Sequence, residues 1–145
     1  MEFTVSARGK SPALPIQQLI KKNFGHLPVE QIESFFGFAE PCTLYGGRVY
    51  TGAELSRYDL RSLYKMGINF RIPLTNHYAT AKEYAECLPF LEKHYRPGNS
   101  VIITNDKLAK WVRADFPDYR VEASVIKNIN TLKKVEKAYE LYDTV

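Results

Sequence analysis

The sequence predicts an α/β protein in which short parallel strands alternate with longer helices. Strand-like runs and helical patterns follow one another about five times along the 145 residues, and such alternation usually gives parallel strands joined by helical crossovers. The run SVIIT, residues 100–104, is apolar at its centre, as expected of a parallel strand that is buried on both faces. The length fits a single domain over residues 1–145.

Residues 1–40 are expected to hold one strand and two helices. Residues 2–8 alternate weakly and are assigned to the first strand. Apolar residues at helical spacing predict a helix from residue 16 to residue 24, ended by Gly25. A second short helix is expected over residues 29–36, with Pro28 suited to its start.

The next predicted strand is CTLY, residues 42–45, which leads into a Gly-Gly turn. Thr51 and Glu54 have the spacing of a capping box, which predicts a helix start. The strand after that helix covers residues 68–76. Pro73 is expected near its end, because proline cannot donate a hydrogen bond within a sheet.

A second capping-box pattern, Thr80 with Glu83, predicts the next helix, which Pro89 is expected to kink or split. The strand over residues 100–104 follows, and Asn105 or Asp106 caps the helix after it.

Residues 120–126 are the last full strand, and Asn130 can cap the final helix. That helix is expected to carry Leu132, Val135, Tyr139 and Tyr142. Residues 144–145 resemble the beginning of a further strand.

Composition indicates a globular protein without specialised segments. Hydrophobic residues make up 45% and charged residues 25% of the chain, as is usual for such proteins. No apolar run is long enough to span a membrane, and the N-terminus does not resemble a signal peptide. Cys42 and Cys87 are too few and too far apart in sequence for a disulfide framework or a metal clip. We therefore expect reduced thiols, a cytoplasmic location and no metal site or membrane partner.

The net charge of +4 permits RNA or a small anionic ligand as a partner but does not require one. Lys133, Lys134 and Lys137 form the densest positive group, and we interpret them as a solvated helix face.

Two architectures fit this order of elements: a short, open doubly wound sheet, or part of a barrel whose complete form needs about 250 residues. An incomplete barrel has unpaired strand edges, which favour self-association.

Polar residues gather where the predicted strands end, and parallel folds place their sites at those ends. We predict a ligand-binding rim formed by Tyr45, Gly46, Gly47, Arg48, Thr75, Asn76, Asn105, Asp106, Ser124 and Asn128. Helix capping and turn formation explain many of these residues equally well. His77 and Lys127 are weak catalytic candidates, as an acid or base and as a nucleophile. No nucleotide-binding loop, nucleophile elbow, zinc-protease motif or iron–sulfur cysteine cluster occurs.

Four segments, LYGG, GINFRIPLTN, SVIITNDKLAKWVRADFPDYRVEASVIKNIN and LYDTV, resemble the collagenase-like peptidase family. In that family a similar helix ends in Phe-Pro-Asp, and the next strand reads Ala-Ser followed shortly by Asn. The matching residues here are Phe116-Pro117-Asp118, Ala123-Ser124 and Asn128. The resemblance covers residues 41–145 as barrel-like strand–helix repeats, whereas residues 1–40 diverge.

The resemblance implies an incomplete TIM-type barrel of about five parallel strand–helix units. Complete family members act in RNA or quinone hydroxylation or have been linked to proteolysis. Many hold an iron–sulfur cluster in a later part of the chain. This chain has no ligands for such a cluster, so its cofactor is unknown, and we expect the N-terminal portion to be inactive alone. The alternatives are a non-catalytic binding module that dimerises through an open sheet edge, and a small hydrolase that uses His77 or Lys127.

Overall fold

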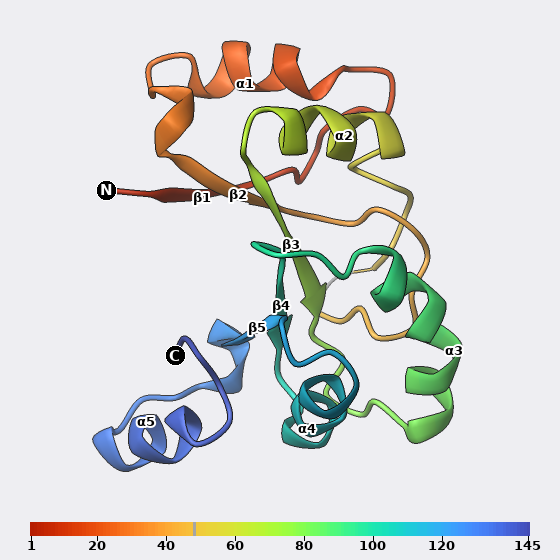
Figure 1. Ribbon diagram of the computed structural model, residues 1–145, viewed down its shortest axis with the longest axis vertical. Helices are drawn as coiled ribbons and strands as arrows, with labels where there is room; N and C mark the ends of the chain where they lie inside the picture. The colour runs from red at the N-terminus through yellow and green to blue at the C-terminus, as the bar shows by residue number, and fades with distance from the viewer. Residues whose placement is uncertain (48) are drawn as a thin grey trace. The chain divides into compact units, whose positions relative to one another are not determined.

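The computed structural model describes residues 1–47 and 49–145 and confirms an α/β protein (Figure 1). In these residues five parallel strands, which form one sheet, alternate with five α-helices. The chain folds as two compact units. The first contains Met1–Pro41 and Tyr50–Ile72, and the second contains Cys42–Val49 and Pro73–Val145.

The first unit pairs three strands in parallel. In β1 and β2, Val5 lies opposite Phe35, and in β2 and β3, Phe35 lies opposite Phe70. Helices α1 and α2 lie side by side in Figure 1. The elements are β1 (Phe3–Ser6), α1 (Ile16–Phe24), a 3-10 turn (Val29–Gln31), β2 (Ile32–Phe36), α2 (Arg57–Lys65) and β3 (Asn69–Leu74), of which residues 73–74 belong to the second unit.

The second unit pairs β4 with β5 in parallel, and Val101 and Ile103 of β4 and Val121 of β5 are fully buried. Each strand is followed by a helix, as the alternating pattern predicts. The elements are α3 (Ala81–Lys93), β4 (Ser100–Ile103), α4 (Asp106–Asp115), β5 (Arg120–Ala123), a 3-10 turn (Val125–Lys127) and α5 (Leu132–Tyr139).

The expected helix over residues 29–36 is wrong, because only Val29–Gln31 forms a helical turn and Ile32–Phe36 is strand β2. Apolar residues at 29, 32, 35 and 36 fit a helix, but a short apolar run does not distinguish a helix from a buried strand. Pairing with β1 and β3 satisfies the backbone on both edges of β2 and buries Ile32 and Phe35.

The expected strand over residues 42–45 is also wrong. This segment forms a turn in which the Tyr45 amide donates to the Cys42 carbonyl over 3.2 Å. Leu44 and Tyr45 are buried, so the apolar run reflects burial of a loop rather than a strand.

The capping box expected from Thr51 and Glu54 does not form. Ser56 and Asp59 cap α2 instead, with each side chain bonded to the other residue's backbone amide. The Glu54 carboxylate accepts a hydrogen bond from the Phe38 amide over 2.9 Å.

Several boundaries match the sequence-based expectation. The capping box of Thr80 and Glu83 starts α3, which continues through Pro89 as one helix rather than splitting. Asn105 caps α4, and Pro73 lies next to the last residue of β3. The cap of α5 is Thr131 rather than Asn130.

The strand order is β1-β2-β3-β4-β5, the same as the order along the chain. A doubly wound sheet reverses direction at a switch point, and the order of these strands contains no reversal. After α5, Thr144 pairs in parallel with Glu122 of β5. The Ala123 amide donates to the Thr144 carbonyl over 2.8 Å, so Thr144 pairs with β5 through an isolated bridge.

Candidate functional site

The end of β3 is held by the loop of residues 42–47, which forms a turn in place of the expected strand. The Asn76 amide donates to the Leu44 carbonyl over 3.0 Å, and its side-chain amide donates to the Thr43 carbonyl over 3.0 Å. The Thr75 hydroxyl donates to the Gly46 carbonyl over 2.7 Å. Thr75 and Asn76 are therefore joined to this loop by hydrogen bonds within the second unit.

Gly46 is required by close packing. A Cβ atom at this position would lie 2.5 Å from the Thr75 carbonyl oxygen and 2.8 Å from the Asn76 nitrogen, distances that no side chain tolerates. Gly47 adopts a positive φ of 76°, and a Cβ there would lie 3.7 Å from Ile126. The loop therefore also lies beside the turn that follows β5.

The end of β4 is linked to the segment after β3. The Asn105 side-chain oxygen caps α4, and its nitrogen donates to the His77 carbonyl over 2.9 Å. The Asn76 side-chain oxygen accepts from the Tyr78 amide over 2.9 Å. The His77 side chain is exposed, and it has no hydrogen bond that would prepare it as an acid or base among residues 1–47 and 49–145.

Asp106, Lys127 and Tyr142 form a polar cluster beyond the ends of β4 and β5. Lys127 Nζ lies 2.6 Å from Asp106 Oδ1 and donates to the Thr104 carbonyl over 3.2 Å. The Tyr142 hydroxyl donates to the same Asp106 oxygen over 2.7 Å, and Lys127 Nζ lies 5.3 Å from the centre of the Tyr142 ring. The ion pair with Asp106 and the hydrogen bond to Thr104 already engage the Lys127 amino group, which does not favour a nucleophilic role.

Two opposing effects set the pKa of the Asp106 carboxyl. Burial raises it, but the hydrogen bonds from Lys127 and Tyr142 outweigh burial and leave this pKa below its usual value. The pKa of the Tyr142 hydroxyl is raised, first by burial and then by its bond to Asp106. Asp106 is therefore held as an anion and Tyr142 as a neutral hydrogen-bond donor.

The remaining predicted rim residues have mainly structural roles. The Ser124 hydroxyl accepts from the Ile126 amide, and Asn128 adopts a left-handed conformation with φ of 56° that ends the turn. The Tyr45 ring packs edge-on against Phe90, with 6.1 Å between centroids. Arg48 lies outside the described residues.

A cavity of about 410 Å³ opens next to the Asp106 cluster and is bordered by α4, α5 and the segment between β5 and α5. We call it the lysine pocket. Its charged lining residues are Lys110, Lys127, Lys134, Lys137, Asp106 and Glu140, so these side chains carry a net charge of +2. Such a volume falls within the range of small-molecule sites, about 300–1,000 Å³.

The lysines of the pocket differ in how far they are engaged. Lys134 Nζ donates to the Asn128 carbonyl over 3.2 Å and to the Asn130 side-chain oxygen over 2.9 Å. Lys110 and Lys137 are exposed, and among the described residues neither has a hydrogen bond or an ion pair. These two cations remain available to a ligand.

The sequence-based prediction included Asp106 and Lys127, assigned Lys134 and Lys137 to a solvated helix face, and did not consider Lys110. Lys134 and Lys137 are three residues apart on one helix, a spacing that places them on one face. Because this helix follows the last strand, the spacing of these two lysines was the sequence signal that could have indicated a positively charged site there. Nothing in the sequence placed Lys110 of α4 beside them.

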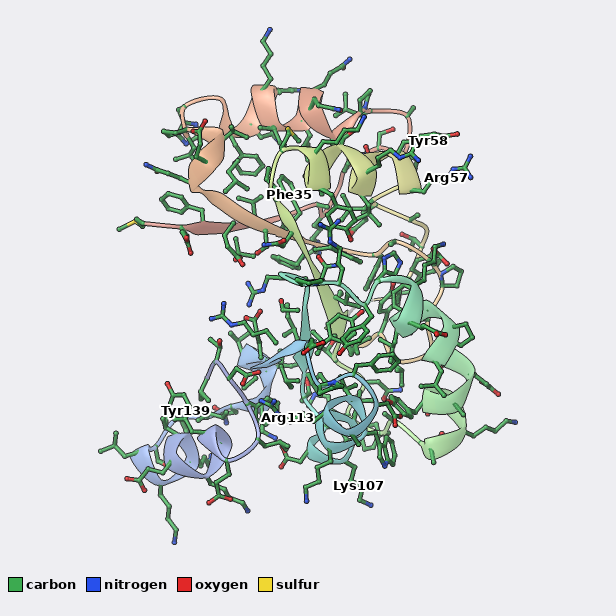
Figure 2. All side chains as sticks on the ribbon, viewed as in Figure 1. Phe35, Arg57, Tyr58, Lys107, Arg113 and Tyr139 are labelled. Carbon is green, nitrogen blue, oxygen red and sulfur yellow. The ribbon has the colours of Figure 1, made fainter. Side chains whose placement is uncertain are left out.

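A second hollow, in the first unit, is lined by Arg57, Tyr58 and Arg61. Arg57 donates to the Tyr58 hydroxyl over 2.7 Å, and both side chains are labelled in Figure 2. This bond lowers the pKa of the Tyr58 hydroxyl. Among residues 1–47 and 49–145 these three alone line the hollow, whereas two helices border the lysine pocket, which is therefore the better-defined site.

No group of three potential metal ligands occurs among the residues that the structure describes. None of the described helices is both long enough and apolar enough to span a bilayer. No protein-family model matches the chain, and no curated protein or solved structure shows significant similarity to it.

Proposed function

We propose that the second unit binds a small phosphate-bearing ligand in the lysine pocket. The observation that carries this proposal is a ligand-sized cavity with four lysines, two of which, Lys110 and Lys137, are exposed and form no hydrogen bond or ion pair within the described chain. The pocket follows the carboxyl ends of β4 and β5, where parallel α/β folds usually bind ligands.

Phosphate suits the chemistry of the pocket better than a neutral ligand does. Lysine ammonium groups act as mobile point charges and bind phosphate without requiring a planar partner. The net charge of +2 complements a phosphate dianion, while the Asp106 carboxylate orients Lys127. The Tyr142 hydroxyl donates its hydrogen bond to Asp106. It therefore lines the pocket and does not donate to the ligand.

Calorimetric titration with inorganic phosphate, pyrophosphate and nucleoside monophosphates tests the proposal. The double variant Lys110→Ala/Lys137→Ala should weaken binding at least about tenfold, because a hydrogen bond to a charged group is worth about 1.5–3 kcal/mol. The matched control is Lys21→Ala/Lys22→Ala, which removes the same charge from exposed positions of α1.

Equal affinity of both double variants would show that net charge alone attracts the anion, and the pocket would then be rejected as the site. Binding of a single-stranded RNA oligonucleotide without binding of mononucleotides would instead indicate an extended surface.

We also propose, as a second candidate, that the chain is the N-terminal portion of a TIM-type barrel resembling the collagenase-like peptidase family. The strand order without reversal and the parallel pairing of Thr144 with Glu122 support it. Complete members act in RNA or quinone hydroxylation or have been linked to proteolysis, and this portion alone would be inactive. Sequencing the coding region beyond Val145 tests this candidate, since further strand–helix units with cysteines are expected.

A binding module that dimerises through an open sheet edge is a third proposal, and β1, as the first strand in the order, supports it. The mean mass in solution should then rise from that of a monomer to that of a dimer as the protein concentration increases. Substitution of Thr4 by proline should abolish the dimer. We also propose a cytoplasmic location, because Cys42 and Cys87 are free thiols and the cytosol keeps thiols reduced.

A further inference from the structure

Cys42 and Cys87 lie 45 residues apart in the sequence, yet their thiols are in contact. The Cys42 thiol donates to Cys87 Sγ over 3.0 Å, and the Thr43 hydroxyl lies 3.4 Å from the same sulfur. Their separation in the sequence suggested two unrelated thiols. The fold places them as a pair within the second unit.

Different elements hold the two cysteines. Cys87 lies on the buried face of α3. Cys42 begins the segment Cys42–Val49, which hydrogen bonds from Asn76 to the Thr43 and Leu44 carbonyls fix in place. Both sides are anchored, and the two sulfur atoms already lie 3.0 Å apart.

We propose that Cys42 and Cys87 are an oxidative modification site that forms an intramolecular disulfide. With a peroxide as the oxidant, the Cys42 sulfur attacks one peroxide oxygen, which breaks the O–O bond and gives a sulfenic acid and water. The Cys87 sulfur then attacks the Cys42 sulfur, and the hydroxyl leaves as a second water. Two thiols and one hydrogen peroxide give one disulfide and two waters, with the thiols oxidised and the peroxide reduced.

The geometry assigns different roles to the two sulfurs. Cys42 is partly exposed and Cys87 is buried, so a peroxide reaches Cys42 first and Cys87 resolves the sulfenic acid. A disulfide bond is about 2.05 Å long, so the sulfurs must approach by only about 1 Å.

The surroundings of Cys42 set the rate of this reaction. Burial raises the pKa of the Cys42 thiol, and its hydrogen bond to Cys87 raises it further. The reactive thiolate is therefore scarce near neutral pH and becomes more abundant as pH rises. We expect slow oxidation at neutral pH that accelerates in alkaline buffer.

The disulfide would fasten the segment Cys42–Val49 to α3. The residues on either side of this segment, up to 41 and from 50, belong to the first unit, whereas the segment itself belongs to the second unit. Gly46 of the same segment supports the end of β3 through Thr75. Oxidation would therefore stabilise this segment against local opening, since a cross-link restricts the unfolded chain.

The test treats the whole chain with hydrogen peroxide at pH 7 and pH 9. Intact mass, free-thiol titration in denaturant and non-reducing peptide mapping are then measured. We expect both thiols to disappear with the loss of two hydrogens, a peptide linking Cys42 to Cys87, and faster reaction at pH 9. The urea midpoint should rise after oxidation and return after treatment with dithiothreitol.

Cys42→Ser and Cys87→Ser serve as matched controls, because each keeps one thiol and should show no reversible rise in the midpoint. The mass and thiol measurements on the unmodified sequence decide the proposal even if a variant fails to fold. Retention of both thiols, a sulfinic acid on Cys42, or disulfides between two chains in place of the internal bond would overturn it.

Discussion

A buried ion pair between Lys10 and Asp59 leads to the sharpest prediction for the first unit. Their charged atoms lie 2.9 Å apart, and the side chains are 0% and 6% exposed. Asp59 also accepts from the Ile16 amide over 2.9 Å and from the Ser56 amide and hydroxyl, each over 2.8 Å. One carboxylate thus joins the loop before α1 to the start of α2.

Replacing Asp59 by alanine removes all of these interactions. Loss of one partner of a buried pair costs about 3–5 kcal/mol, because the remaining charge stays uncompensated. The lost cap of α2 and the unpaired Ile16 amide each cost about 1 kcal/mol or more, but they share one side chain and do not add fully. We expect the variant to lose about 3–5 kcal/mol of unfolding free energy in urea denaturation.

Lys10→Met should cost less than Asp59→Ala, since the carboxylate keeps its hydrogen bonds to Ser56 and Ile16. The double variant isolates the coupling between the two charges. If Asp59→Ala costs less than about 1 kcal/mol, the pair is not buried as the structure shows, and the reasoning fails.

The pH dependence follows from the same carboxyl group. Burial raises the pKa of Asp59, but hydrogen bonds from Lys10, Ser56 and Ile16 outweigh burial and leave it below its ordinary value. A depressed folded-state pKa contributes stability that is complete above the unfolded pKa of about 3.9 and lost as pH falls through the folded value. Asp59→Ala should therefore flatten the acid limb of a plot of stability against pH.

Two further predictions concern the second unit. Gly46→Ala should destabilise it by about 1–3 kcal/mol in urea unfolding, since the new methyl group would overlap the Thr75 carbonyl; an unchanged midpoint would show that the loop is not packed there. Tyr142→Phe removes a donor to Asp106, so the Asp106 pKa should rise in a carbon-detected NMR titration, and a pKa equal to that of the unmodified chain would contradict the cluster.

Signals that act over a few residues predicted much of the fold. Two of these signals are helix caps, in which Thr80 with Glu83 and Asn105 bond to nearby backbone amides. The third is the run of consecutive apolar residues in β4. The error over residues 29–36 has a different origin. Only pairing with β1 and β3 decides that Ile32–Phe36 is a strand, and the local pattern does not contain that information.

The final helix shows the same limit in side-chain burial. Leu132 and Tyr139 belong to the apolar set that indicates the helix, but in the structure they are 82% and 60% exposed, and Tyr139 is labelled on α5 in Figure 2. Tyr142, which belongs to the same expected set, is buried, and so is Ala138. Periodicity identified the helix, whereas its rotation about its own axis depends on what packs against it.

The candidate site depends both on short-range sequence signals and on contacts between distant elements. Its residues on α4, in the turn after β5 and on α5 are separated by up to 36 residues in sequence, as Asp106 and Tyr142 are. Parallel strands that run in chain order bring successive strand ends together, so the alternation alone directs the search for a site to these ends. The sequence did not predict how many lysines line the pocket, because that number depends on which faces α4 and α5 turn toward it. Arg113 helps to fix the orientation of these two helices. Arg113 on α4, labelled in Figure 2, donates to the Leu141 carbonyl over 2.6 Å and pairs with Asp143 at 2.8 Å. These contacts tie the segment that follows α5 to α4, and lysines of both helices line one cavity.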